Sequence, residues 1–250
     1  MQNPSNSPNT ALITGVSRSL GLGFAVARQL AEKGYHVILA ARDQQQAEQL
    51  ASELRRSGHT ATALGLDLAD RDSIHSASER LSEKIDRLDV LVNNATAMPD
   101  FERQSVFEVD FDTLQALFKV SVFGTWALIN ALLPLLRRSP AARIVNVSSA
   151  AVQQIGLHRP GPIFSPAYSL AKYTLNALTS TLAGALSETT ILVNAIDPGP
   201  VASHPERGDD GGDRSPAEAA KGVVWAATLD TGGPTGGFFY DGQPVSANSP

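Results

Sequence analysis

Short runs of apolar, β-branched residues alternate with longer amphipathic segments along the chain, and this alternation limits the fold more than any other feature. Three of the runs, at residues 37–39, 90–92 and 144–145, contain no polar residue. Strands of this kind are typical of a sheet that is covered on both faces. Repeated strand–helix–strand units predict a parallel sheet. We therefore predict an α/β fold that is doubly wound, with helices on both faces of the sheet.

The periodicity places seven strands and the helices between them. The strands are expected at residues 11–14, 36–41, 60–66, 89–93, 143–147, 190–196 and 237–240. The helices are expected at residues 21–33, 44–57, 70–86, 111–138, 166–187 and 216–229. Pro134 is expected to kink the last part of the long helix. No linker divides residues 10–245, so we predict a single domain there and a disordered tail at residues 1–9.

Composition removes several classes of function. The 250 residues carry a formal net charge of -5, which argues against a nucleic-acid partner because phosphate binding needs a positive field. There is no cysteine, which excludes disulfides, thiol nucleophiles and cysteine-ligated zinc, and we predict no metal site. Residues 1–9 lack the features of a secretory signal, and the apolar run 131–136 is too short to span a bilayer. We expect a cytoplasmic protein without a membrane partner.

A glycine-rich turn follows the first predicted strand and opens the first predicted helix. It reads TGVSRSLGLG from Thr14 to Gly23. Gly15 suits a tight turn, and Gly21 and Gly23 allow the helix to pack close to the sheet. The free amides and the dipole of a helix N-terminus favour a bound pyrophosphate. The alternative is a glycine turn that serves packing alone.

Tyr168 and Lys172 lie four residues apart in a predicted helix and therefore share one face. A lysine ammonium beside a phenol favours the tyrosinate, which makes the tyrosine a better acid–base catalyst near neutral pH. Most Tyr-x-x-x-Lys pairs are surface contacts. This one follows a strand that ends in Ser148 and Ser149, which strengthens the catalytic interpretation.

Taken in order, these motifs resemble the short-chain dehydrogenase/reductase family, and its carbonyl-reductase-like members in particular. Thr14, Gly15 and Gly21 match the family motif Thr-Gly-x-x-x-Gly-x-Gly, whose middle glycine is Ser19 here. The resemblance extends from residue 11 to about residue 245. It implies a Rossmann-type domain with a parallel seven-stranded sheet and a nicotinamide cofactor.

Residues at the end of the second predicted strand point to the kind of cofactor. An acid at this position would pair with the ribose 2′-hydroxyl of NAD. This chain has Ala41 followed by Arg42, and a guanidinium suits the 2′-phosphate of NADP(H). Arg18 in the glycine loop could supply a second guanidinium, and in the family basic residues at these two positions mark NADP preference. The alternative is two solvated surface arginines.

The resemblance also implies the roles of individual residues. Tyr168 would donate the proton, Lys172 would lower the pKa of Tyr168 and hold the nicotinamide ribose, and Ser149 would bind the carbonyl oxygen. Ser121 stands where the family has an asparagine that holds a water of a proton relay. The resemblance implies cofactor contacts, besides those of Tyr168 and Lys172, for Gly15, Ser17, Arg18, Ser19, Leu20, Gly21, Arg42, Asp67, Leu68, Asn94, Ala95, Pro198, Gly199, Val201 and Ser203.

Some of these polar residues have an equally strong structural interpretation. Asp67 and Asn94 follow predicted strands, where their side chains could cap strand ends instead of touching the cofactor. Asn93 is expected to brace the sheet.

The predicted activity is that of an NADPH-dependent oxidoreductase that reduces a ketone or aldehyde to an alcohol. Two alternatives stay open: a cofactor-bound non-redox enzyme such as an epimerase or cyclase, and an NADP-binding regulator. Ser19, Thr96 and Ser121, which depart from the family motifs, keep them open. Residues 150–166 and 203–215 are expected to form the substrate loops. A homodimer or homotetramer would form through helices 111–138 and 166–187, with Trp126 and Leu182 in the contact.

Overall fold

The computed structural model describes residues 8–97, 100, 103–155, 163–203 and 211–245. Most of the predicted tail and the middle of each predicted substrate loop lie outside the described residues.

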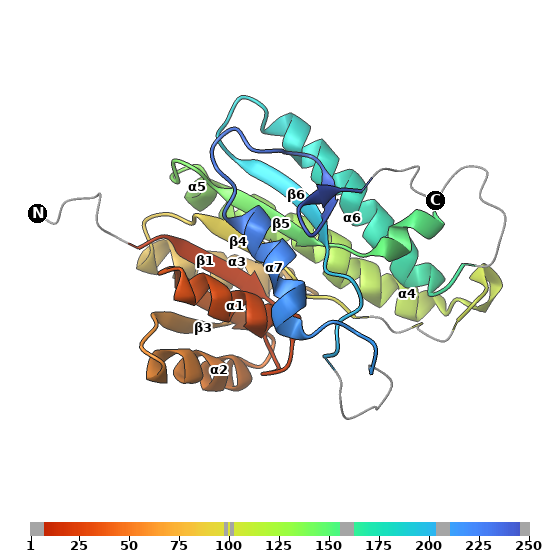
Figure 1. Cartoon of the computed structure of the whole chain (residues 1–250), viewed down its shortest axis with the longest axis horizontal. Coiled ribbons are helices and arrows are strands. Elements are labelled where there is room, and N and C mark those ends of the chain that lie inside the picture. Colours follow the sequence, from red (N-terminus) through yellow and green to blue (C-terminus); the bar gives the residue numbers. More distant parts are fainter. Residues whose placement is uncertain (1–7, 98–99, 101–102, 156–162, 204–210, 246–250) are drawn as a thin grey trace, which may run out of the picture.

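An eight-stranded sheet in the order β3-β2-β1-β4-β5-β6-β7-β8 forms the centre of the described fold (Figure 1). The first seven strands are parallel, which confirms the predicted doubly wound α/β class. The prediction of seven strands misses β8, which pairs antiparallel with β7 and has only two residues, one of them proline. The strands are β1 (Thr10–Thr14), β2 (His36–Ala41), β3 (Ala61–Gly65), β4 (Val90–Asn93), β5 (Arg143–Val147), β6 (Leu192–Asp197), β7 (Phe238–Tyr240) and β8 (Gln243–Pro244).

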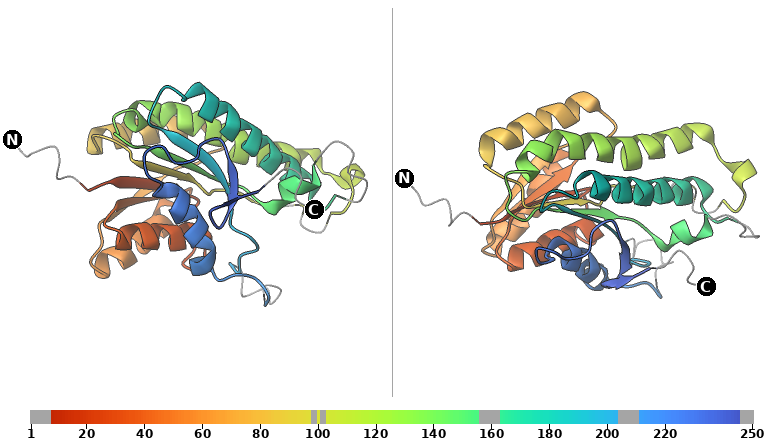
Figure 2. Two further views of the ribbon diagram at one scale, coloured as in Figure 1. Left: turned by 45° about the horizontal axis from the view of Figure 1, so that its top comes forward. Right: turned by 90° about the horizontal axis from the view of Figure 1, so that it is seen from above.

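Helices cover both faces of this sheet, as the right-hand view of Figure 2 shows. One layer contains α1, α2 and α7, and the other contains α3, α4, α5 and α6. Their bounds are α1 (Leu22–Glu32), α2 (Gln44–Arg56), α3 (Arg71–Lys84), α4 (Phe111–Phe118), α5 (Thr125–Leu136), α6 (Pro166–Ala185) and α7 (Pro216–Ala227), with short 3-10 turns η2 (Val106–Glu108) and η4 (Ala150–Gln154).

Two apolar clusters fix these layers to the sheet. The alternation of side chains along a strand sends neighbouring residues to opposite faces. In β1, Ile13 therefore belongs to the cluster under α1, α2 and α7, and Leu12 belongs to the cluster under α3 and α5. Both side chains are fully buried, as expected for strands that are covered on both faces.

The predicted long helix at residues 111–138 contains an irregular turn that the periodicity did not reveal. A π-helical segment, η3 (Lys119–Gly124), joins α4 to α5, and α5 then remains α-helical through Pro134 to Leu136. The irregularity thus lies at η3, ahead of the predicted position at Pro134. Gly124 packs against the chain after β3: a Cβ there would lie 2.9 Å from the carbonyl carbon of Leu68 and closer still to its oxygen.

The run Phe111–Leu136 is long and apolar enough to cross a membrane by length and composition alone. Part of this apolar character has a clear structural use. Leu128, Ile129 and Leu132 are fully buried against the sheet. Core helices of soluble proteins have the same composition.

Candidate active site and cofactor site

The carboxyl ends of the parallel strands meet at one edge of the sheet, where the loops after β1, β2, β4, β5 and β6 lie (Figure 1). In open α/β sheets, ligands bind in the crevice at this edge, near the point where the strand order reverses. Here the order reverses between β1 and β4. Most of the residues singled out from the sequence follow strands that end at this edge or lie in the first turns of the following helices, and Ser121 lies in the middle of the helical run α4–η3–α5.

The glycine loop after β1 is packed so closely that side chains would not fit. Gly15 has a φ of 72°, and a Cβ on it would lie 2.6 Å from the Cα of Ala95. A Cβ on Gly23 would lie 2.7 Å from Nδ2 of Asn94. The glycines therefore bring the start of α1 against the end of β4, which confirms the tight turn predicted at Gly15 and the close packing predicted for Gly23. The nearest atoms to a Cβ on Gly21 belong to Arg18 of the same loop, so its predicted packing against the sheet is not seen.

The same loop keeps the start of α1 open to an anion. No side chain caps the helix at Gly21. Ser17, Ser19 and Leu20 are exposed, and Arg18 is partly exposed. The first amides of a helix without a cap need an acceptor from outside the helix, and a phosphate supplies one. The residues present therefore fit the pyrophosphate of a dinucleotide.

Two charged residues, Arg42 and Asp43, follow β2, and the structure gives them different surroundings. Ala41 is buried and Arg42 is exposed. Asp43 caps α2, because its Oδ1 accepts the amides of Gln45 at 2.8 Å and Gln46 at 3.3 Å. The carboxylate of Asp43 thus has a structural use, and Arg42 is left as the charged side chain at the position where the cofactor ribose is expected.

The strand-end polar residues have structural partners, as the capping alternative predicts. Asp67 Oδ1 accepts the amide of Ala69 at 2.8 Å. Asn94 Nδ2 donates to the carbonyl oxygen of Thr14 at 2.8 Å, and the Thr14 hydroxyl accepts the amides of Asn94 at 3.0 Å and Ala95 at 3.1 Å. Leu68 is buried beside Gly124. These residues hold the ends of β1, β3 and β4 in place around the candidate cofactor site.

Asn93 braces the sheet, as predicted. Its Nδ2 donates to Oδ1 of Asn146 at 2.8 Å, and Asn146 Nδ2 donates to the Thr179 hydroxyl at 2.8 Å. This buried chain of side-chain hydrogen bonds connects β4, β5 and α6. It fixes the strand that leads to Ser149 relative to the helix that carries Tyr168.

Ser149, Tyr168 and Lys172 come together where β5 ends and α6 begins. The Ser149 side chain accepts the amide of Ala151 at 3.2 Å and hydrogen-bonds to the Tyr168 hydroxyl. Lys172 Nζ lies 5.5 Å from the centre of the Tyr168 ring and donates to the carbonyl oxygen of Val147 at 2.7 Å. The hydroxyl of the neighbouring Ser148 is buried without a hydrogen-bond partner among the described residues, so Ser149 is the serine that reaches the phenol.

Burial shifts the pKa values of both titratable members of this group. Burial raises the pKa of Tyr168 to about 12; the nearby Asp197 charge adds to this rise, and the Ser149 hydrogen bond opposes it. Burial lowers the pKa of Lys172 to about 7. The physical reason for both shifts is that loss of water disfavours the charge on each group. The expectation that Lys172 lowers the pKa of Tyr168 stays a prediction.

Ser121 lies in the π-helical segment η3 and is 1% exposed. Its hydroxyl is 3.2 Å from that of Thr96, in the loop after β4. Two of the three residues that depart from the family motifs, Thr96 and Ser121, are therefore hydrogen-bonded to each other.

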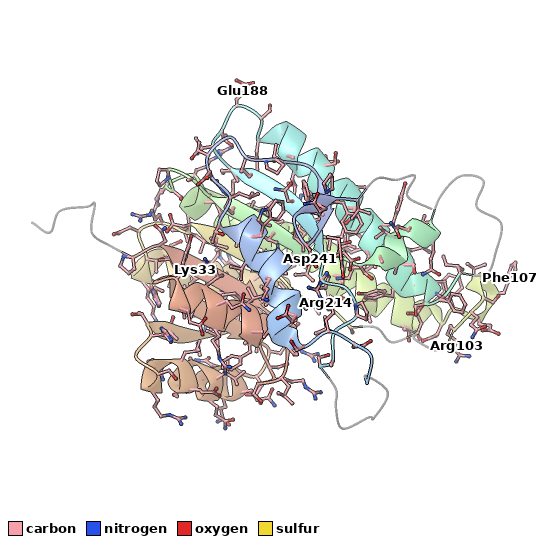
Figure 3. All side chains as sticks on the ribbon, in the orientation of Figure 1. Lys33, Arg103, Phe107, Glu188, Arg214 and Asp241 are labelled. Atoms are coloured by element: carbon pink, nitrogen blue, oxygen red, sulfur yellow. The ribbon has the colours of Figure 1, made fainter. Side chains whose placement is uncertain are left out.

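The segment after β6 is held by two residues to which the sequence analysis gave no role. Asp197 accepts the amide of Gly199 at 2.9 Å, and Gly199 has a φ of 71°. Arg214 donates to the carbonyl oxygen of Pro198 at 3.1 Å and forms an ion pair with Asp241 at 3.1 Å (Figure 3). The signal for Asp197 was its place as the one charged residue at the end of an apolar strand.

Val201 and Ser203, the other predicted cofactor contacts after β6, are held by backbone hydrogen bonds of the same segment. Val201 forms a parallel bridge with Arg214, and the Ser203 amide donates to the carbonyl oxygen of Val201 at 2.7 Å. Within the described residues, no group of three or more His, Asp or Glu side chains could hold a metal ion. At this edge the structure thus brings together the Tyr168 phenol, the Ser149 hydroxyl, the Lys172 amine and the glycine loop.

Comparisons with known proteins agree with this arrangement. Residues 9–209 match the family model described as short chain dehydrogenase. The chain is 34% identical over 228 residues to the short-chain dehydrogenase anuI of Penicillium roqueforti, covering 87% of each chain. It is 36% identical over 192 residues to the oxidoreductase UcpA of Salmonella typhimurium, covering 76% of this chain and 68% of the relative. A solved Escherichia coli short chain dehydrogenase, described as putative and complexed with NADPH, superposes with a TM-score of 0.82 at 27% identity, covering 94% of this chain and 96% of that one.

Proposed function

The chain belongs to the short-chain dehydrogenase family, and from this premise we propose that it uses NADPH to reduce a ketone or aldehyde carbonyl to an alcohol. The observation that carries the proposal is the contact of Ser149, Tyr168 and Lys172 at the edge of the sheet that also holds the glycine loop. A substrate carbonyl placed against Ser149 and Tyr168 lies between two hydroxyl donors.

In this mechanism the dinucleotide, when bound, supplies a hydride to the carbonyl carbon. The Ser149 hydroxyl hydrogen-bonds to the carbonyl oxygen and stabilises the negative charge that develops on it. The Tyr168 phenol gives its proton to that oxygen. Lys172, whose pKa burial lowers to about 7, would supply the proton that replaces it on the phenol. Oxidation of the alcohol uses the same groups in reverse.

The raised pKa of Tyr168 suits the reductive direction. With a pKa of about 12, the phenol holds its proton throughout the neutral range. Reduction needs that proton, whereas oxidation needs the phenolate as a base. Near neutral pH, therefore, the phenol is in the state that carbonyl reduction requires.

The preference for NADPH over NADH rests on Arg42. Its guanidinium is exposed at the end of β2, while the neighbouring carboxylate of Asp43 is used as a helix cap. Bidentate hydrogen bonds from a guanidinium suit a 2′-phosphate. The relative of known structure that was complexed with NADPH supports the same choice.

We expect Arg42→Asp to weaken NADPH binding by roughly ten- to a hundredfold, because a charged hydrogen bond contributes about 1.5–3 kcal/mol. NADH, which lacks the phosphate, should bind with unchanged or improved affinity. Cofactor titrations followed by fluorescence measure both constants. Arg56→Asp, at the far end of α2, is the matched control. Equal losses for both cofactors would refute the assignment.

A turnover assay separates the proposal from its two alternatives. NADPH absorbance is followed with a panel of ketones, aldehydes and quinones. Consumption that depends on the carbonyl compound supports the reductase. Binding of NADPH without consumption by any member of the panel favours the cofactor-bound non-redox enzyme or the NADP-binding regulator.

We also propose that a second copy of the chain covers the outer face of α4, η3 and α5. Phe111 is 71% exposed, Phe123 58% and Trp126 46%, and a hollow of about 600 Å³ lies beside Phe118 and Phe123. Leu182, which was also expected in the contact, is half-buried and packs against the core instead. Exposed aromatic residues gathered on one face are typical of interfaces.

If a homodimer forms through this face, a substitution in the face should change the mass of the protein in solution. Phe123→Glu should convert a dimer into a monomer, because a charge in the centre of an apolar contact is desolvated without a partner. Light scattering after size-exclusion chromatography measures the mass. Gln46→Glu adds the same charge on the exposed side of α2 and should leave the dimer intact. A wild-type monomer at high concentration would contradict this proposal.

A further inference from the structure

The carboxylate of Asp197 connects two parts of the candidate site. Asp197 is the last residue of β6 and is only 6% exposed. It accepts the amide of Gly199 at 2.9 Å and also the backbone amide of Ala150, the residue after Ser149. One buried side chain thus holds both the start of η4, next to the proposed catalytic Ser149, and the turn at Gly199, for which cofactor contacts are expected.

We propose that Asp197 is a positioning residue of the active site, whose carboxylate ties the Ser149 turn to the Gly199 turn and keeps a negative charge close to the Tyr168 phenol. The inference rests on the proposed function and adds to it a residue that determines the geometry of the site and the direction in which it works best.

The backbone hydrogen bonds between β5 and β6 end just before Asp197, whose carboxylate makes the next contacts between the two chain segments. The last residues in register between β5 and β6 are Val147 and Ile196, and the Ser148 amide donates to the carbonyl oxygen of Ile196 at 2.7 Å. Beyond this point the two chains diverge into separate turns. The Asp197 carboxylate spans the gap with two further hydrogen bonds, and buried amides that lose such a partner are destabilising. Without it, Ser149 and Gly199 would no longer be fixed relative to each other.

Three groups from other elements face this carboxylate. Tyr168 comes from α6, Arg214 from the segment before α7, and Asp241 from the turn between β7 and β8. Burial raises the pKa of Asp197; Arg214 opposes the rise and Asp241 adds to it. The charge is therefore present at pH values above this raised pKa and is lost as the pH falls through it.

The sign of the effect on Tyr168 follows from the charges. An ionised Asp197 disfavours the phenolate and so raises the pKa of Tyr168. The phenol then stays protonated, which favours reduction, and the phenolate that oxidation needs forms only at higher pH. Removing the charge should move the rise of alcohol oxidation with pH to lower pH.

Two substitutions separate the tether from the charge. Asp197→Asn keeps an acceptor oxygen but removes the charge, and should shift the pH at which oxidation rises downward by about one unit. Asp197→Ala removes both, and should also lower kcat/KM for reduction by on the order of ten- to a hundredfold, because the reacting groups are misplaced. The exposed Asp230→Asn, on the loop after α7, controls for net charge and should change neither quantity.

Hydrogen–deuterium exchange tests the tether independently of any activity. In the cofactor-free protein, the amides of Ala150 and Gly199 should exchange faster in Asp197→Ala than in wild type. Unchanged exchange at both amides overturns the tether, and an unshifted pH profile in Asp197→Asn overturns the role of the charge. If wild type turns over no substrate, the proposed function fails, while the exchange measurement still decides whether Asp197 holds the two turns.

Discussion

Tyr168→Phe is expected to lower kcat for carbonyl reduction by about 10²- to 10⁴-fold, the usual contribution of a positioned acid–base group. The change removes only the hydroxyl that hydrogen-bonds to Ser149, which is the group that we propose gives its proton to the carbonyl oxygen. The ring and its contact with Lys172 remain. Steady-state assays of NADPH consumption measure the loss, and fluorescence titration should show NADPH affinity within a few-fold of wild type.

Tyr173→Phe is the matched control, because Tyr173 lies on the same helix with its side chain largely exposed. It loses the same hydroxyl and should keep wild-type kcat. Activity of Tyr168→Phe close to that of wild type would mean that another group supplies the proton, and the mechanism proposed above would be wrong.

Gly124→Ala should destabilise the fold by about 3 kcal/mol or more, because the new methyl group has no room beside the backbone of Leu68. For a domain of this size, that corresponds to a melting temperature lower by roughly 6–12 °C. Thermal unfolding followed by circular dichroism measures the shift. The backbone of Leu68 cannot move away without disturbing the chain after β3, where cofactor contacts are expected for Asp67 and Leu68.

Gly184→Ala is the matched control, because it makes the same change in a helix but should not lower the melting temperature. Gly184 lies near the end of α6, and a Cβ there would meet nothing within 4 Å. Alanine is a better helix former than glycine by up to about 1 kcal/mol, so this variant should be as stable as wild type or slightly more stable. Similar melting temperatures for the two variants would show that the chain around Gly124 can relax.

The strands and helices of this fold were readable from the sequence because each carries its own periodic signal. The fully apolar runs at residues 37–39 and 90–92 predicted strands of a covered sheet, and they are β2 and β4. The π-helical segment at Lys119–Gly124 was missed because it leaves the apolar pattern of the flanking helix almost unchanged. Gly124, at the end of this segment, packs against Leu68, and such a contact depends on how distant segments pack.

The site was readable only in part. The spacing of Tyr168 and Lys172 predicted that they share a helix face, and the structure brings both to Ser149. The pKa values could not be predicted, because they depend on burial, and burial is set by the whole fold. The amides that Asp197 accepts were equally hidden, since Ala150 and Gly199 are remote in sequence and meet only when β5 and β6 pair.

The short antiparallel strand at the end of the described chain has a consequence for solubility. β7 is rich in aromatic residues, and without β8 it would be an edge strand whose unpaired backbone groups could hydrogen-bond to other molecules. β8 covers that margin, and Pro244 within it has no amide hydrogen with which to recruit a further strand. A chain that ends before residue 243 should therefore aggregate at high protein concentration, even though the proposed catalytic residues Ser149, Tyr168 and Lys172 would be unchanged.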